Sequence, residues 1–362
     1  MTDDGMLSRA AQALAALVLA ACTSNPYYDA AKPHHARDGF HNRYPHAEKG
    51  SFWKWKLEEW RDGLPAPAPP GGWHFDVVTP DVGFLRTNRT VETVTWIGHA
   101  SFFVQRGGVN ILADPHLTER ASPLSFAGPK RVVPPALDFN DLPHIDVVVV
   151  SHNHYDHMDA ETLTRLAQQS GGPPRYLVGL GLKRWFIAQG IETVDELDWW
   201  DGIEVNGVKF NFVPTQHWSK RTLWDENQTL WGGWLIESPT FRFLHAGDSG
   251  YSRDFVDIRN RYGKIDLAAL PVGGYAPRWF MQANHFDPDD AVKAHTDLGT
   301  RFTVGMHWGT FANLTDEPLD EVPQRVAEAI ARSNVSPDRF FLMRHGETRL
   351  LDRRYLDALP MH

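Results

Sequence analysis

Alternating hydrophobic and polar positions open the folded part of the chain with three closely spaced strands. Residues 93–97, 101–105 and 109–113 are rich in β-branched and aromatic side chains, and short turns that contain glycine separate them. An apolar run at 146–150, with valine at 147–150, follows, which is typical of a strand buried on both faces. These patterns predict a sheet whose first strands begin near residue 92.

Segments of helical and of strand character alternate along the rest of the chain. One helix has a clear start signal, because Asp287 is a typical N-cap, Pro288 suits the first helical position, and Asp289 and Asp290 favour the positive end of the helix. This alternation predicts an α/β fold in which helices cover the sheets. The further segments are helices at 160–169 and 182–189 and strands at 176–178, 208–213, 233–237, 241–245 and 265–270.

The N-terminus has the pattern of a targeting signal. The apolar stretch at 10–21 is too short to cross about 30 Å of hydrocarbon as a helix, but it fits the apolar region of a signal peptide. It ends in Leu-Ala-Ala-Cys at Cys22, the only cysteine, and resembles a bacterial lipobox. We therefore expect a lipoprotein signal peptide at 1–21 and a lipid anchor on Cys22 in the bacterial cell envelope. The alternative is a chance cysteine after a secretory signal. Asp3 and Asp4 make the leading region acidic, and Met6 is a second candidate start.

Residues 22–90 are expected to form a tether and an N-terminal extension ahead of a main domain at 91–352. A short amphipathic helix is predicted at 51–60, followed by the proline and glycine run at 65–72. Its Phe52, Trp53, Trp55 and Trp60 either anchor at a membrane interface or pack on the domain. Four histidines in the polar stretch before it, His34, His35, His41 and His46, are expected to be solvated.

Composition and charge narrow the classes of function. The chain has 362 residues, 42% of them hydrophobic and 22% charged, as in globular proteins that form either one large domain or two. The net charge is −9 and no long basic run occurs, which argues against nucleic-acid binding. Its 14 tryptophans indicate either an apolar or interfacial surface or a large aromatic core. The sequence gives no indication of the oligomeric state.

A dense cluster of possible metal ligands directly follows the valine-rich strand. The segment Ser151-His152-Asn153-His154-Tyr155-Asp156-His157 has the spacing H-x-H-x-D-H, for which roughly 0.003 chance matches per chain of this composition are expected. On an extended backbone His152 and His154 project to the same side, and Asp156 and His157 follow where the chain turns. Imidazole and carboxylate ligands without a thiolate suit a catalytic zinc ion.

Such a site needs further ligands from distant segments. His217, Asp248 and His307 each follow an apolar strand and precede a turn or small residues. Taken singly, each is more often an ordinary residue at the end of a strand. Their common placement makes them the candidates that complete the site.

This set of residues resembles the metallo-β-lactamase superfamily of binuclear zinc hydrolases. The resemblance implies an αββα sandwich of two β-sheets flanked by helices and a cofactor of two Zn²⁺ ions. His154 stands where the di-iron oxidoreductase branch has Glu, which favours hydrolysis over redox chemistry. By this resemblance His152, His154 and His217 hold one zinc ion, Asp156, His157 and His307 hold the other, and Asp248 bridges them.

From about residue 94 to 347 the chain is similar, within this superfamily, to the family of phospholipases D that hydrolyse N-acylphosphatidylethanolamine. This resemblance implies a phospholipid substrate at a membrane surface and attack on phosphorus by a metal-bound hydroxide. Asn284 precedes His285 where the animal enzyme has Gln, a departure that affects substrate contacts. The shared runs lie at 128–131, 151–157, 196–200, 216–223, 246–248, 275–281 and 307–311.

Several residues are assigned roles around this reaction. Asp156 and Asp248 are taken as catalytic carboxylates, and His285 either contacts the phosphate, protonates the leaving oxygen or only bonds to the backbone. His99 and Asp114 either orient metal ligands or stabilise turns. Candidates for substrate contacts, against surface solvation or core packing, are Tyr155, Lys130, Arg131, Lys220, Arg221, Arg278, Trp218, Trp224, Trp279, Phe280 and Met281.

Two other functions remain open at this stage. A related hydrolase with the same metals could open a lactone or cleave a nucleotide phosphodiester, because the fold does not settle the substrate. A surface lipoprotein that binds lipid without turnover is the second alternative.

Overall fold

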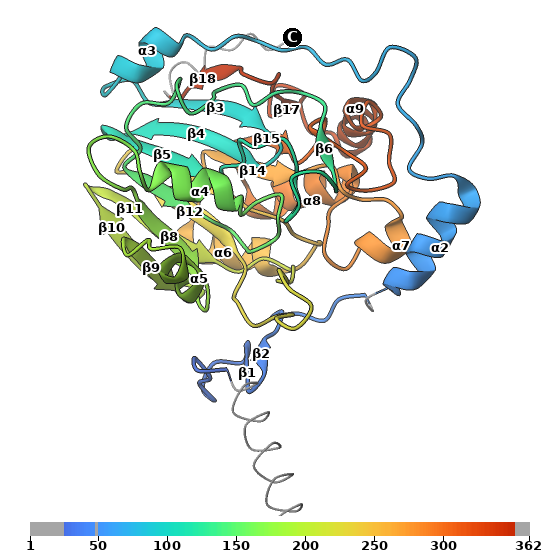
Figure 1. Ribbon diagram of the computed structural model, residues 1–362, viewed down its shortest axis with the longest axis horizontal. Helices are drawn as coiled ribbons and strands as arrows, with labels where there is room; N and C mark the ends of the chain where they lie inside the picture. The colour runs from blue at the N-terminus through green and yellow to red at the C-terminus, as the bar shows by residue number, and fades with distance from the viewer. Residues whose placement is uncertain (1–24, 48–49, 352–362) are drawn as a thin grey trace, which may run out of the picture.

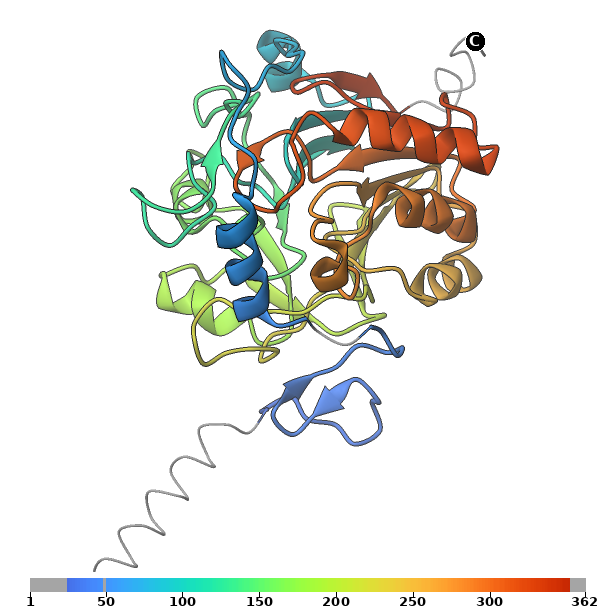
Figure 2. The same ribbon diagram turned by 90° about the vertical axis from the view of Figure 1, so that its right-hand side faces the viewer.

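The computed structural model describes residues 25–47 and 50–351, which form two mixed β-sheets packed face to face with helices on both outer faces (Figure 1 and Figure 2). The predicted αββα sandwich is confirmed. The signal peptide expected at 1–21 and the expected lipidation site Cys22 lie outside the described residues. No helix within the described ranges is long and apolar enough to cross a bilayer.

The first sheet has the strand order β18-β3-β4-β5-β7-β8-β9. The strands from β18 to β5 are antiparallel, whereas those from β5 to β9 are parallel and need crossovers. Helix α4 (Ala160–Leu166) lies in the crossover from β7 to β8, and α5 (Lys183–Ala188) in the crossover from β8 to β9. Both helices pack apolar side chains on the outer face of the sheet. The strands are β3 (Thr93–Gly98), β4 (Ser101–Arg106), β5 (Val109–Ala113), β7 (Val147–Val149), β8 (Arg175–Gly179), β9 (Val194–Leu197) and β18 (Thr348–Leu350).

The second sheet has the order β10-β11-β12-β13-β14-β15-β17, antiparallel up to β13 and parallel beyond it. Helices α6 (Asp254–Tyr262), α8 (Pro288–Leu298) and α9 (Val322–Ser333) cover its outer face. The predicted start of α8 is confirmed, because the Asp287 side chain accepts a hydrogen bond from the Asp290 amide. The strands are β10 (Gly202–Val205), β11 (Val208–Val213), β12 (Gly233–Glu237), β13 (Arg242–His245), β14 (Leu267–Pro271), β15 (Phe302–Met306) and β17 (Phe340–Leu342).

The inner faces of the two sheets share one hydrophobic core. Phe102 of the first sheet and Phe243 of the second contact each other across it, with 6.2 Å between ring centres, and within the second sheet Phe212 packs on Trp234 at 4.8 Å. This packing fixes the sheets against each other. Loops that leave strands of both sheets therefore meet at one edge of the sandwich.

Shorter elements surround this edge. Helix α2 (Phe52–Asp62) follows the N-cap Ser51 and confirms the helix predicted at 51–60, and it packs on the domain through Trp55, whose ring lies 4.8 Å from that of Phe280. Trp53 and Trp60 of the same helix are exposed. The other short elements are α3 (Val82–Thr87), α7 (Arg278–Met281) and the paired strands β6 (Lys130–Arg131) and β16 (Phe311–Ala312).

Residues 25–47 are folded onto the domain. They contain a small hairpin of β1 (His35–Ala36) and β2 (Gly39–Phe40), which lies below the sandwich in both views (Figure 1 and Figure 2). The expectation that His34 and His35 are solvated is wrong: both are buried, with Nε2 atoms 2.7 and 3.0 Å from the carboxylate of Asp198. The partner is more than 160 positions away in sequence, so local composition could not show it.

Candidate metal centre

Loops that follow four strands bring seven predicted ligands together. His152, His154, Asp156 and His157 lie on the loop after β7, in the first sheet. The second sheet contributes the other three, and all seven side chains converge at the edge between the sheets. These three are His217 beyond β11, Asp248 beyond β13 and His307 beyond β15.

Three imidazoles form the first half of the cluster. His154 Nδ1 lies 2.9 Å from His152 Nε2 and 3.2 Å from His217 Nε2. His217 donates from Nδ1 to the carbonyl of Asn284 at 2.8 Å. Ser151 donates its hydroxyl proton to Asp114, so it accepts the Nδ1 proton of His152 at 2.9 Å. The Nε2 lone pairs of His152 and His217 therefore both face His154, an arrangement that a cation satisfies.

Two imidazoles and two carboxylates form the second half. His157 Nε2 lies 3.4 Å from Asp156 Oδ2 and 3.2 Å from Asp248 Oδ2, and the corresponding distances from His307 Nε2 are 3.2 and 3.3 Å. Without an ion, positive charge has to come from protons: burial alone would lower the pKa of His307, but Asp248 and Asp156 raise it to about 9. A metal ion between these atoms replaces those protons.

Asp248 joins the two halves. Its Oδ2 atom lies 3.2 Å from His157 Nε2 and 3.8 to 3.9 Å from the Nε2 atoms of His217 and His152. The carboxylate is buried, which alone would raise its pKa, but His157 and His307 hold the pKa well below its usual range. The group is therefore ionised and placed to bridge two ions. Buried atoms of the site without a hydrogen-bond partner include His154 Nε2, His157 Nε2, Asp248 Oδ1 and His307 Nδ1.

The imidazoles of the first half have the protonation state that metal binding needs. Burial lowers the pKa of His154 to about 4 and that of His217 to about 3, and it takes the pKa of His152 well below its usual range. All three rings are therefore neutral at physiological pH. Together with His157 and His307, whose extra protons a metal ion would displace, they make a set of five imidazoles and two carboxylates without a thiolate, which fits two catalytic zinc ions.

Asp114 and His99 form hydrogen bonds that orient two of the predicted ligands. Asp114 Oδ2 accepts hydrogen bonds from His157 Nδ1 at 2.8 Å and from Ser151 Oγ at 2.6 Å, so it directs Nε2 of His157 into the site. His99 Nε2 lies 3.0 Å from Asp156 Oδ2, and because burial lowers the pKa of His99 to about 3, its neutral ring donates this bond. Ser151 was missed in the sequence, although it directly precedes the motif.

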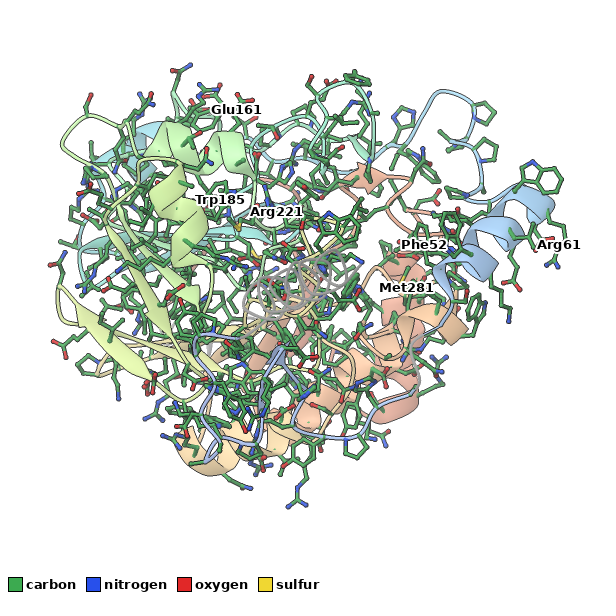
Figure 3. All side chains as sticks on the ribbon, turned by 60° about the horizontal axis from the view of Figure 1, so that its bottom comes forward. Phe52, Arg61, Glu161, Trp185, Arg221 and Met281 are labelled. Atoms are coloured by element: carbon green, nitrogen blue, oxygen red, sulfur yellow. The ribbon has the colours of Figure 1, made fainter. Side chains whose placement is uncertain are left out.

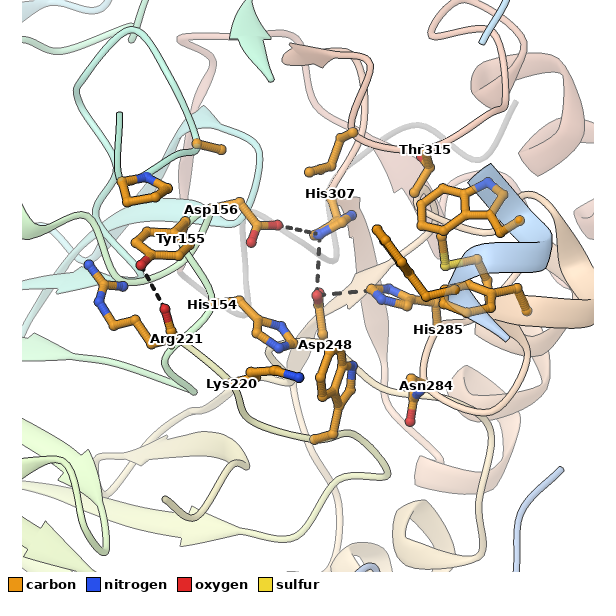
Figure 4. Close-up of a pocket in the computed structure, with 18 of the residues that line it drawn as sticks. His154, Tyr155, Asp156, Lys220, Arg221, Asp248, Asn284, His285, His307 and Thr315 are labelled. Carbon is orange, nitrogen blue, oxygen red and sulfur yellow. Dashed lines mark hydrogen bonds and ion pairs between the residues drawn. The ribbon is translucent and has the colours of Figure 1, made fainter. Parts of the chain in front are cut away.

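A pocket of about 570 Å³ opens above these ligands (Figure 4). His154, Asp156, Asp248, His285 and His307 form its polar floor. Apolar side chains dominate the walls. All three of Phe52 on α2, Met281 on α7 and Arg221 line the pocket, and Figure 3 shows Phe52 and Met281 close together and Arg221 apart from them. The wall residues include Phe52, Trp55, Ala121, Pro123, Trp218, Leu223, Phe280, Met281 and Leu314.

Some predicted substrate contacts line this pocket. Tyr155, Trp218, Lys220, Arg221, Phe280 and Met281 do so. The Tyr155 hydroxyl donates to the Arg221 carbonyl at 2.7 Å. The Arg221 guanidinium lies over the Tyr155 ring and donates to the carbonyls of Asn153 and Met158, so it braces the motif loop.

Three predicted cationic contacts lie elsewhere. Lys130 forms an ion pair with Glu119 at 2.8 Å at the surface, and Arg131 is buried and donates to main-chain carbonyls, including those of Thr118 and His116. Arg278 forms ion pairs with two acidic groups before and within α8. None of the three lines the pocket. Trp224 and Trp279 are also outside its lining.

Comparisons with known proteins agree with this fold. A profile of the beta-lactamase superfamily domain matches residues 109–308, more than half of the chain. A solved metallo hydrolase from the archaeon Ignicoccus hospitalis shares the fold, with a TM-score of 0.55 and 21% identity over 73% of this chain and 99% of that one. The chain belongs to the metallo-β-lactamase superfamily.

Two curated relatives are more similar in sequence. The chain is 40% identical over 264 residues to a Caenorhabditis elegans protein named N-acyl-phosphatidylethanolamine-hydrolyzing phospholipase D 1, a match that covers 70% of this chain and 74% of that protein. It is 34% identical over 265 residues to a mitochondrial protein of the same family name from Saccharomyces cerevisiae, which covers 71% of this chain and 56% of the yeast protein. The chain is thus a metal-dependent hydrolase of the metallo-β-lactamase fold.

Proposed function

We propose that this chain is a binuclear zinc phosphodiesterase that cleaves N-acylphosphatidylethanolamine-like phospholipids in the manner of a phospholipase D. The observation that carries the proposal is the convergence of seven ligand side chains, four of which line the floor of an apolar pocket of about 570 Å³. The names of the worm and yeast relatives give the same substrate class.

The described residues account for how both metal ions would be held. His152, His154 and His217 would hold one ion, and Asp156, His157 and His307 the other, with the Asp248 carboxylate shared. Two zinc ions bound there would supply Lewis-acid activation of water and of the phosphoryl group.

We propose that His285 contacts the phosphoryl group. Its Nδ1 atom lies 3.8 Å from Asp248 Oδ2 and it lines the pocket (Figure 4). Because burial lowers the pKa of His285 to about 3, the ring is neutral at physiological pH and is a poor proton donor to the leaving oxygen. We therefore assign it a hydrogen-bonding role toward the substrate. Lys220 also lines the pocket and is paired with Glu226 at 3.0 Å.

The rim of the pocket suits a membrane surface. Phe52 and Leu223 line the opening, and their chain neighbours Trp53 and Trp224 are each at least 80% exposed. Large exposed apolar side chains around an opening are typical of interaction sites, and aromatic rings are favoured at the lipid headgroup level. We propose that this rim contacts the bilayer, so that acyl chains enter the apolar walls.

The proposed lipid anchor at Cys22 is compatible with this placement. Asn25, three positions later, donates its side-chain amide to the carbonyls of Ala36 at 3.1 Å and Gly39 at 2.8 Å. A lipid on Cys22 would therefore hold the folded segment close to the membrane of the bacterial cell envelope.

Turnover on vesicles tests the proposal. Zinc-loaded full-length protein is incubated with vesicles containing N-acylphosphatidylethanolamine, and products are identified by mass spectrometry beside assays with p-nitrophenyl phosphodiesters and lactones. N-acylethanolamine and phosphatidic acid are the expected products, and Asp248→Ala should abolish them. Turnover of the small esters with no lipid product would refute the phospholipase assignment, and a metal-loaded protein without any turnover would favour a lipid-binding role.

A further inference from the structure

The folded segment 25–47 reaches the metal centre through one side chain, Asn42. Its Nδ2 atom donates to the carbonyl of His217 at 2.9 Å, and its Oδ1 atom accepts from the amide of His217 at 3.1 Å. Asn42 Oδ1 also accepts from the indole Nε1 of Trp231 at 3.1 Å. One amide side chain thus pairs both main-chain polar groups of a buried metal-ligand residue.

The His217 loop receives a second contact from the same segment. The Phe40 amide donates to the carbonyl of Asn227 at 2.8 Å, and Asn227 in turn accepts at Oδ1 from the amide of Ser219 at 3.2 Å. Ser219 is two residues beyond His217. The approach at Phe40 is close, because a Cβ on Gly39 would lie 2.2 Å from the Asn227 carbonyl oxygen.

Asn42 is itself held on both sides. Before it, His34 and His35 bind the carboxylate of Asp198. After it, Arg43 donates to Asp254 at 2.8 Å and to Asp257 at 3.0 Å. Because the segment is attached to the domain at both ends, the position of the Asn42 amide is set by the domain fold.

The ring of His217 is consequently fixed from two directions. Nδ1 donates to the Asn284 carbonyl, and the main chain is paired with Asn42. Without Asn42, the amide and carbonyl of His217 lose these partners while the residue stays buried. Because an unpaired buried main-chain group is costly in free energy, the backbone is expected to shift toward water. Such a shift moves Nε2 away from His154.

We propose that Asn42 is a positioning residue of the metal centre, and that segment 25–47 is therefore part of the catalytic unit rather than a tether. The inference rests on the proposed metal centre. It assigns Asn42 to the three-histidine half of that centre, because the contacts of Asn42 reach His217 and none of the ligands of the other half among the described residues.

Release of metal to a chelator tests this proposal without any turnover. Full-length wild type and Asn42→Ala are loaded with zinc, and the two equivalents are followed during competition with a chromophoric chelator. In Asn42→Ala we expect one equivalent to leave about 10 to 100 times faster, on the scale of the affinity that is typically lost when a group that orients a metal ligand is removed. The other equivalent should leave at the wild-type rate. Cobalt-loaded protein should show an altered visible absorption spectrum in the same variant.

Asn88 provides a matched control. It pairs both main-chain groups of Val91 in the same way, accepting from its amide at 2.9 Å and donating to its carbonyl at 2.6 Å, far from the metal centre. Asn88→Ala should lower the thermal midpoint but leave both release rates and the cobalt spectrum unchanged. Should Asn42→Ala fail to fold, Asn42→Asp keeps the acceptor toward the His217 amide and should show a smaller acceleration.

The outcomes separate this inference from the proposed function. If wild type binds two zinc ions and both Asn42→Ala and Asn42→Asp release them at the wild-type rate, only the role of Asn42 is overturned and the metal centre stands. Wild type that binds no zinc would overturn the metal centre itself. Equal acceleration in Asn88→Ala would show that Asn42 acts through general stability, which also contradicts the proposal.

Discussion

Replacing Asp114 with Asn should weaken both metal sites at once. The carboxylate fixes the Nδ1 proton of His157 directly and, through the hydroxyl of Ser151, that of His152. These two histidines belong to different halves of the centre. Asn is nearly isosteric and tolerates the left-handed backbone of Asp114, where φ is 41°, so the main effect is electrostatic.

The size of the effect follows from these bonds. Asp114 accepts at 2.7 Å from the Ser151 amide, at 2.6 Å from its hydroxyl and at 2.8 Å from His157, all in a fully buried position. Losing the charge of one such acceptor costs about 1.5–3 kcal/mol. We expect zinc affinity to fall about 10 to 100-fold for each equivalent.

Equilibrium competition with a chelator on full-length protein measures this change. Asp146→Asn is the matched control, since Asp146 also accepts from a main-chain amide, that of Asn110 at 2.7 Å, at the opposite end of the same strands. It should leave both affinities unchanged. Wild-type affinity in Asp114→Asn, or loss confined to one equivalent, would refute the idea that one carboxylate fixes a ligand in each half.

Three further changes should have separable effects. Gly247→Ala should cost about 2–5 kcal/mol in chemical denaturation, since φ is 62° and the new Cβ would lie 2.6 Å from that of Ser151, whereas Gly207→Ala, at φ 80° in open space, should cost only the backbone part; equal costs would contradict the clash. Burial and Glu59 raise the pKa of Asp316 to about 6. The protonated Asp316 carboxyl therefore stabilises the fold fully below its unfolded pKa near 3.8, and this stabilisation is lost as the pH rises through 6. Asp316→Asn, which can still accept from Trp55, should thus gain thermal stability over wild type above pH 6, by at most about 3 kcal/mol, and a pH-independent difference would oppose this. Replacing Leu223 and Trp224 with Ser should lower vesicle binding at least 10-fold in a co-sedimentation assay without changing the thermal midpoint. The control Val91→Ser should leave both vesicle binding and the thermal midpoint unchanged. Unchanged binding in the Leu223 and Trp224 variant would contradict the proposal that the rim contacts the membrane.

The ligand set could be predicted from sequence because its geometry is local or tied to strand ends. Four ligands lie within six positions after a buried strand, and His217, Asp248 and His307 follow strands whose apolar character is visible in the chain. The start of α8 was equally predictable, since the hydrogen bond from the Asp290 amide to the Asp287 side chain lies within one turn.

Other features depend on contacts that no local pattern shows. Arg131 was expected to attract phosphate, but β6 pairs with β16, about 180 positions away, and this pairing buries its guanidinium among main-chain carbonyls and against Phe311. His34 and His35 are buried for the same kind of reason, by Asp198. The ion pairs of Arg278 are more local in sequence, because its partners Asp287 and Asp290 follow within 12 positions.

The metal content of the purified full-length protein is the most direct test of the central claim, which is that seven side chains from both sheets hold a pair of ions. Elemental mass spectrometry on zinc-replete, desalted protein should give two zinc ions per chain for wild type and at most one for Asp248→Ala, because the shared carboxylate is lost. Wild type that retains no stoichiometric metal, or Asp248→Ala that still retains two ions, would contradict the account.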